Sequence, residues 1–239
     1  MAEKKKVKRE FVDASTGETK KRTTAVVSAA DKSSATTKRI LSVILWIVAL
    51  AAEVGAILIL NGTWYLEGNN QLYFLIGLVV VDLILVVIGA LLWKGANRLD
   101  PPSKKNKFTF YLWSQMGLIA AIICFLPLII LLLKNKDMDA KSKKIVSIIA
   151  AVALVIAALL SIDFSPTSSE DLAAAQEAAA EIGDGSAYWT QFGKSYHLNP
   201  NCQTLLNSST IYSGTVEEAF AANREDPCNF CAITEAAEE

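Results

Sequence analysis

Four long apolar segments constrain the fold of this chain more than any other feature. They cover residues 40–60, 72–93, 112–133 and 145–162. The core of a bilayer is about 30 Å thick, so a helix needs about 20 apolar residues to cross it. Because only helices and closed barrels satisfy their backbone polar groups in lipid, these segments predict helices. The sequence therefore predicts an α-helical membrane protein whose four-helix transmembrane domain, residues 40–162, lies in the lipid bilayer.

Charges outside these segments predict an orientation. Residues 1–39 hold 11 Lys and Arg against 5 Asp and Glu, and we expect them to form a disordered, basic tail. Loops rich in Lys and Arg remain on the cytoplasmic side of a membrane. We therefore expect the tail and the basic loop 94–111 in the cytoplasm. The loop 61–71 has no Lys or Arg and is expected outside.

The next loop leaves two topologies open. Residues 134–144 carry five lysines, yet four full crossings place this loop outside. In the first topology all four segments cross, and both termini are cytoplasmic. In the second, the segment 112–133 bends near Pro127 and returns to the same side, so the C-terminal region lies outside. Segment length favours the first topology, and the lysines favour the second.

Two acidic residues lie inside the predicted spans. Glu53 is in the first span and Asp82 is in the second, at a similar expected depth in an antiparallel helix pair. An ionisable residue inside a membrane indicates a functional site, because a charge there is costly. A path for protons or cations is one interpretation. The other is a structural pair, protonated and hydrogen-bonded between helices.

The composition changes abruptly after residue 162. Residues 163–186 contain serines followed by Glu170 and Asp171, which predict the start of a helix, and then an alanine-rich run that ends at Gly183. We interpret this stretch as a helical linker, too weakly apolar to build a core. Residues 187–239 predict a small α+β domain. Its expected elements are strands over 188–192 and 195–197 and a short helix over 216–222, with Thr215 and Glu218 as a capping box.

One motif in this domain carries a specific chemistry. His197, Cys202, Cys228 and Cys231 have the spacing H-x4-C-x25-C-x2-C. A CxxC turn presents two thiolates to one metal, and three cysteines with one histidine form a set that Zn²⁺ prefers. Disulfides are the competing interpretation, although three cysteines leave one without a partner. The sequence predicts a closed, structural zinc site.

The residues around this motif resemble a known family. Segments 196–202 and 217–231 are similar to the zinc-binding domain of the Ada-type DNA alkylation-repair proteins, and closer to short bacterial H…C…CxxC modules appended to secreted or membrane proteins. In the Ada-type domain four cysteines bind the metal, and the first accepts a methyl group. Because His197 stands at that place, the resemblance implies the metal site and not the methyl transfer. The four-helix region resembles no family with an assigned function.

The remaining features narrow the functional class. A four-ligand zinc has no open position, and the chain's only histidine is one of the ligands, so the sequence argues against an enzyme. Residues 164–239 hold 2 basic residues against 12 acids, which argues against nucleic acid as a partner. We predict a bacterial plasma-membrane protein in which the zinc domain serves protein interaction or sensing. The alternative is a small transporter or channel that uses Glu53 and Asp82. Tyr188, Trp189 and Phe192 are either exposed on the surface that binds a partner or packed over the metal site, and we favour the second interpretation. The oligomeric state is left open.

Overall fold

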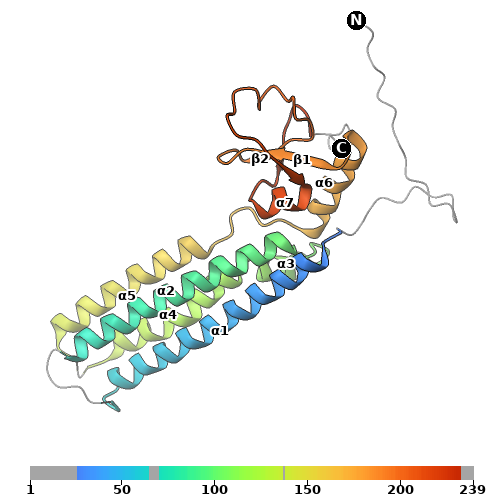
Figure 1. Ribbon diagram of the computed structural model, residues 1–239. Helices are drawn as coiled ribbons and strands as arrows, with labels where there is room; N and C mark the ends of the chain where they lie inside the picture. The colour runs from blue at the N-terminus through green and yellow to red at the C-terminus, as the bar shows by residue number, and fades with distance from the viewer. Residues whose placement is uncertain (1–25, 65–69, 137, 233–239) are drawn as a thin grey trace, which may run out of the picture. The chain divides into compact units, whose positions relative to one another are not determined.

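A computed structural model describes residues 26–64, 70–136 and 138–232 of the chain (Figure 1). The chain forms two compact units. The membrane unit consists of residues 32–97 and 106–166, and the C-terminal unit consists of residues 1–31, 98–105 and 167–239. The predicted tail up to residue 25 and the acidic residues 233–239 lie outside the described part.

Four helices of the described chain are long and apolar enough to cross a membrane. They are α1 (Ala29–Leu60), α2 (Asn70–Leu99), α4 (Met116–Lys134) and α5 (Ala140–Ser161). In Figure 1 these helices run alongside one another within the membrane unit. Together with the strands of the C-terminal unit, they confirm the predicted fold class, a helical membrane protein with a small α+β C-terminal region.

The first helix begins earlier than predicted. Helix α1 starts at Ala29, whereas residues up to 39 were expected to be disordered. The Ser28 hydroxyl accepts a hydrogen bond from the Asp31 N–H at 3.0 Å and so satisfies a free donor of the first turn. Extending an existing helix requires no new nucleation, so the apolar span can carry its polar N-terminal residues into the helix. The prediction of disorder is therefore wrong for residues 29–39.

The third predicted span is divided into two helices. A short helix, α3 (Lys107–Ser114), is separated from α4 by Gln115, which lies outside helical geometry. The Gln115 side chain donates to the Asp163 carbonyl at 2.7 Å and accepts from the Asp163 N–H at 3.1 Å. These tertiary bonds have no sequence signature, so the span begins at Met116 and not at residue 112.

Helix α4 decides between the two predicted topologies. It continues without a break through Pro127 over 19 residues. A re-entrant segment needs two shorter pieces joined by a turn, and the structure has neither between Met116 and Lys134. The re-entrant interpretation is therefore wrong, and the arrangement with four helices of membrane-spanning length stands.

Small residues let the membrane helices pack closely. Ala49, Ala56, Ala121 and Ala150 are buried in the core cluster of the membrane unit, around larger side chains such as Phe125. Outward-facing isoleucines, leucines and valines of the same helices are exposed in the isolated chain. Van der Waals packing of small residues is the main attraction between helices in lipid, where the apolar surface itself gives no driving force. This pattern is that of a lipid-surrounded bundle.

The C-terminal unit is built from short strands and two helices. Its elements are α6 (Ser169–Ile182), β1 (Ser186–Trp189), β2 (Ser195–Tyr196), β3 (Tyr212–Thr215), α7 (Val216–Ala221) and β4 (Asp226–Pro227). Strand β1 pairs antiparallel with β3, and β2 pairs parallel with β4. The first predicted strand ends at Trp189 and not at residue 192, because the Thr190 hydroxyl accepts from the Gly193 N–H and starts a turn. The capping box of Thr215 and Glu218 is confirmed.

Helix α6 corrects the prediction of a spacer arm. Its start is as expected, with a capping box between Ser168 and Asp171. However, Leu172, Ala175 and Ala179 are buried in the core cluster of the C-terminal unit. Alanines allow α6 to lie close to its neighbours, so a helix of low hydrophobicity still contributes to the core. Residues 169–182 are therefore part of the folded domain.

Two distant segments of the chain bind to α6. The Ser169 N–H donates to the Pro102 carbonyl at 3.0 Å, and the Lys104 N–H donates to Glu170 at 2.8 Å. Although burial raises the pKa of Glu170, hydrogen bonds from Ser103 and Lys104 lower it to about 2. Further along α6, the Gln176 side chain accepts from the Val26 N–H at 2.9 Å and donates to the Val26 carbonyl at 2.7 Å. Val26, which precedes α1, and the α2–α3 connection are thus attached to this helix.

Candidate metal centre

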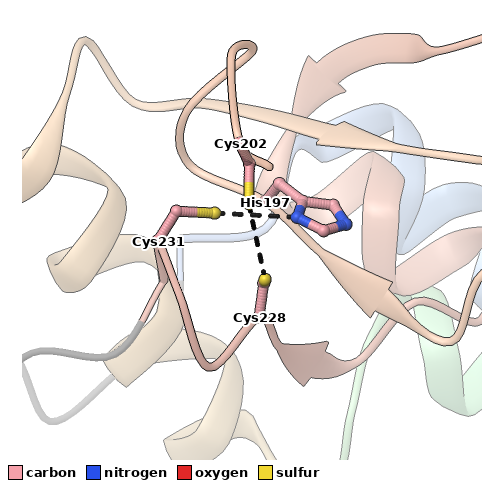
Figure 2. Close-up of side chains that lie close together, drawn as sticks. All are labelled: His197, Cys202, Cys228 and Cys231. Carbon is pink, nitrogen blue, oxygen red and sulfur yellow. Dashed lines mark hydrogen bonds between the residues drawn. The ribbon is translucent and has the colours of Figure 1, made fainter. Parts of the chain in front are cut away.

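The four predicted metal ligands meet in the C-terminal unit. One ligand atom from each of His197, Cys202, Cys228 and Cys231 lies within 4.8 Å of all the others. Figure 2 shows the three sulfur atoms and the imidazole converging from three separate pieces of backbone. Three of the four residues are buried, and Cys231 is half-buried. The arrangement is compatible with a bound metal ion.

Backbone hydrogen bonds fix each ligand in place. His197 follows β2 and forms an isolated bridge with Tyr188, in which each N–H donates to the other carbonyl at 2.7 and 2.8 Å. The Cys228 N–H donates to the Tyr196 carbonyl at 2.9 Å and so places the CxxC turn beside the histidine. The turn is closed by the Cys231 N–H, which lies 3.2 Å from the Cys228 carbonyl. The short β2–β4 pair therefore holds the CxxC turn next to His197.

The structure has no disulfide among the three cysteines of the cluster. The Sγ atoms of Cys202 and Cys228 are 3.8 Å apart, and the Sγ atom of Cys231 lies 3.6 Å from His197 Nδ1. A disulfide bond is about 2.05 Å long. All the cysteines of the described chain are free thiols. The competing disulfide interpretation is not the one that the structure adopts.

The electrostatics of the centre favour a cation. Burial lowers the pKa of His197, so the imidazole is neutral and able to act as a ligand. Burial raises the pKa of Cys202, but hydrogen bonds from Thr204, Cys231 and Cys228 outweigh it and hold this pKa below its usual value. In contrast, burial and the hydrogen bond with Cys202 raise the pKa of Cys231 to about 12. Thiols this close cannot all ionise alone, and a coordinated cation removes that repulsion.

Thr204 is a member of the centre that the sequence did not reveal. Its hydroxyl oxygen lies 3.2 Å from Cys202 Sγ, 3.4 Å from His197 Nδ1 and 3.6 Å from Cys228 Sγ. A hydroxyl donor next to thiolates stabilises their negative charge, in the way that outer-shell partners tune metal ligands. No spacing rule predicts such a residue. The only signal is a hydroxyl two positions after a ligand cysteine.

The predicted aromatic cover is present only in part. Trp189 is buried and stacks on Tyr212, with ring centroids 6.3 Å apart. Phe192 is 91% exposed, so it does not cover the metal centre. It follows the end of β1, in the turn that the Thr190 hydroxyl organises. The expectation that these aromatic residues cover the metal site is therefore wrong for Phe192, whose exposure agrees with the alternative of a surface position.

The predicted intramembrane acids lie apart from this centre. Glu53 and Asp82 belong to α1 and α2 of the membrane unit, where both are buried. The structure thus buries both of the acids that the sequence placed at similar depth, one on each helix.

Fold and centre define a helical membrane protein with a His/Cys cluster in a small C-terminal unit. No protein-family model, no curated protein and no solved structure matches this chain. The resemblance of the C-terminal region to the Ada-type zinc-binding domain therefore stays a prediction.

Proposed function

We propose that this protein is a membrane-anchored zinc-binding module, in which a structural zinc ion holds a small surface for protein interaction or sensing. The observation that carries the proposal is the geometry of the four side chains. Zn–S bonds of about 2.3 Å in a tetrahedron place two sulfur atoms about 3.8 Å apart, and a Zn–N bond of about 2.05 Å places sulfur and nitrogen about 3.6 Å apart. Two of the six separations have these values, 3.8 Å between the Sγ atoms of Cys202 and Cys228 and 3.6 Å between Cys231 Sγ and His197 Nδ1, and all six are within 4.8 Å.

A structural role for the ion follows from the number of its ligands. Four protein ligands leave no position for water or substrate, whereas catalytic zinc sites keep one position open. His197 is the only histidine of the chain and would be one of those ligands. We therefore propose no enzymatic activity for this centre.

The C-terminal unit has a small core, which a bound zinc ion would help to stabilise. Five of its fourteen buried core residues are alanines, and two are the ligands Cys202 and Cys228. A core of this size, half of it alanines and metal ligands, contributes only a modest hydrophobic free energy. Zinc binding adds its free energy to folding, because the unfolded chain has no preformed site.

A cleft beside the centre supports the interaction role. A cavity of about 330 Å³ is lined by the ligands His197 and Cys228 and, among other residues, by Lys194, Asn229 and Phe230. Phe230 and Lys194 are both exposed. Loops that are tied to the metal thus present an apolar and a cationic group to solvent. This is the surface that we propose for a protein partner.

We also propose that the zinc centre faces the cytoplasm. Val26, just before α1, and Pro102, between α2 and α3, both hydrogen-bond to α6. If α2 crosses the membrane, α6 lies on the side of the α2–α3 connection. That connection is rich in lysine and arginine, which favours the cytoplasm. A reporter that is active on one side only, fused after Glu239, tests this assignment, and activity in the outer compartment would contradict it.

The zinc proposal is tested on the purified full-length protein. We expect one zinc ion per chain by elemental analysis and loss of that ion in Cys228→Ser and His197→Ala. Cys124→Ser is the matched control, because Cys124 is a buried cysteine of the membrane unit and lies outside the cluster. Wild-type protein that binds no zinc at one equivalent would refute the proposal. Equal zinc loss in all three variants would refute the assignment of the ligands.

A further inference from the structure

The membrane unit contains two buried carboxyl groups that the zinc centre does not involve. Glu53 is 4% exposed and Asp82 is 2% exposed in the isolated chain. They come from α1 and α2, the first two helices of the membrane unit. Burying a carboxylate in an apolar environment is so costly that such a group is neutralised, paired or bound to an ion. The surroundings of each carboxyl group show which of these applies.

Glu53 is held by the backbone of α4. Its Oε1 atom accepts a hydrogen bond from the Leu128 N–H at 3.2 Å. Leu128 follows Pro127, which has no N–H and disturbs the hydrogen bonding of the helix around it. Neighbouring helices commonly satisfy backbone groups next to a proline in a membrane. A hydrogen bond donated to a carboxylate also favours its charged form.

Asp82 has no such partner. Its Oδ1 atom is buried without a hydrogen bond among the described residues. On the same face of α2, Val79 and Val86 are buried in the apolar core cluster. The titratable groups of other helices that face Asp82 are Glu53 of α1 and Cys124 of α4. No described cation balances a charge on either carboxyl group, and Asp82 also lacks the hydrogen-bond donor that Glu53 has, so Asp82 is the less able of the two to remain charged.

We propose that Glu53 and Asp82 form a proton-binding site inside the membrane unit, in which Asp82 carries an exchangeable proton. Binding converts the Asp82 carboxylate to a carboxylic acid with a proton from the aqueous phase, and release reverses that step. A metal cation fits less well, because hard cations require about six or more oxygen ligands. Here the described oxygen ligands are two carboxyl groups in an apolar core. The site does not depend on the proposed zinc function.

A lipid-soluble carbodiimide distinguishes a protonated carboxyl group from an ionised one. The carboxyl proton moves to a nitrogen of dicyclohexylcarbodiimide while the carboxyl oxygen bonds to its central carbon, and rearrangement leaves a stable N-acylurea. In full-length wild-type protein in phosphatidylcholine vesicles, we expect an adduct on Asp82 at acidic and neutral pH, seen by intact mass and peptide mapping. The labelled fraction falls as the pH rises, and sodium at constant pH does not change it.

Variants locate the proton. Asp82→Asn loses the adduct and keeps its helical content and melting temperature, because a carboxamide replaces a neutral acid of the same shape. Glu53→Gln keeps the adduct at acidic pH but is labelled less at alkaline pH, since the neighbouring negative charge that retains the Asp82 proton is gone. Asp139→Asn is the matched control, because Asp139 is an exposed acid that caps α5 and asparagine caps equally well. Its labelling equals that of the wild type.

Two results would overturn the proposal. One is the absence of an adduct on Asp82 at every pH in folded wild-type protein. The other is suppression of the adduct by sodium at constant pH, which would indicate a metal-cation site. The wild-type pH series alone decides the first point, even if a variant fails to fold.

Discussion

The membrane unit and the C-terminal unit bury their polar groups by opposite means. In the membrane unit, apolar helices surround a few polar atoms, and one carboxyl group, that of Asp82, is left without a partner. In the C-terminal unit, polar ligands form the centre, and a modest apolar core lies around them. The membrane unit can rely on lipid to hold its outer surface. Under the proposed function, a bound ion adds to the free energy of folding that the modest core of the C-terminal unit provides.

Removal of the proposed zinc ion is expected to have the largest effect, and to affect only the C-terminal unit. When the full-length protein is treated with a zinc chelator, we expect the C-terminal unit to lose its structure while α1, α2, α4 and α5 remain folded. Structural zinc contributes about 10–16 kcal/mol to folding in small zinc domains, which exceeds the stability of most domains of this size. Amide hydrogen exchange measures both units in one sample. Slow exchange at Trp189 and Phe220 after chelation would show that the apolar core suffices.

Tight packing of the membrane unit can be tested at a glycine. A Cβ atom added at Gly117 would lie 2.6 Å from Ala90 Cβ, so α4 and α2 would have to separate. We expect Gly117→Ala to lower the free energy of unfolding by about 1–3 kcal/mol, as overpacking does elsewhere. Unfolding in mixed micelles, followed by circular dichroism, measures it.

Gly77→Ala is the control for that substitution, because a Cβ atom there meets nothing within 4 Å. It removes a helical glycine without a clash and is expected to be neutral or slightly stabilising. If both variants lose the same stability, the close approach of α2 and α4 is not the reason why Gly117→Ala is destabilising.

The smallest expected effect concerns the attachment of the α2–α3 connection to α6. The pKa of Glu170 is about 2 in the folded protein against an ordinary value of 4.5. Its contribution to stability is therefore complete above pH 4.5 and is lost as the pH falls towards 2. We expect Glu170→Gln to lower the free energy of unfolding by less than about 1 kcal/mol at neutral pH, since the contact of Glu170 with Ser103 and Lys104 is partly exposed. It should also weaken the acid dependence of hydrogen exchange in α6.

A second acid on the same helix gives the comparison for this effect. Glu181 is exposed near the C-terminal end of α6, away from residues 98–105. Glu181→Gln should leave both the neutral stability and the acid dependence unchanged. The same loss in both variants would mean that the charge of the helix, and not the contact with Lys104, is responsible.

Local features of the sequence predicted local features of the structure. Apolar length predicted four helices, and the serine and threonine caps predicted the starts of α6 and α7. Cysteine and histidine spacing predicted the four residues that meet in the C-terminal unit. The apolar segments and the helix caps are local in the sequence. The ligand spacing is recognisable because one metal ion needs a particular set of side chains. These signals need no knowledge of the remaining chain.

Other features were decided only by tertiary contacts. The break at Gln115 depends on Asp163, the burial of α6 depends on α7 and on the strands, and the place of Thr204 depends on where three ligands meet. The partner of β1 is β3, more than twenty residues away in the chain. From composition alone we predicted that α6 is a linker, because alanine has little hydrophobicity. Alanine contributes to the core because its small side chain lets α6 lie close to its neighbours. Whether it does so depends on the surface that the helix faces, and the sequence of α6 does not contain that information.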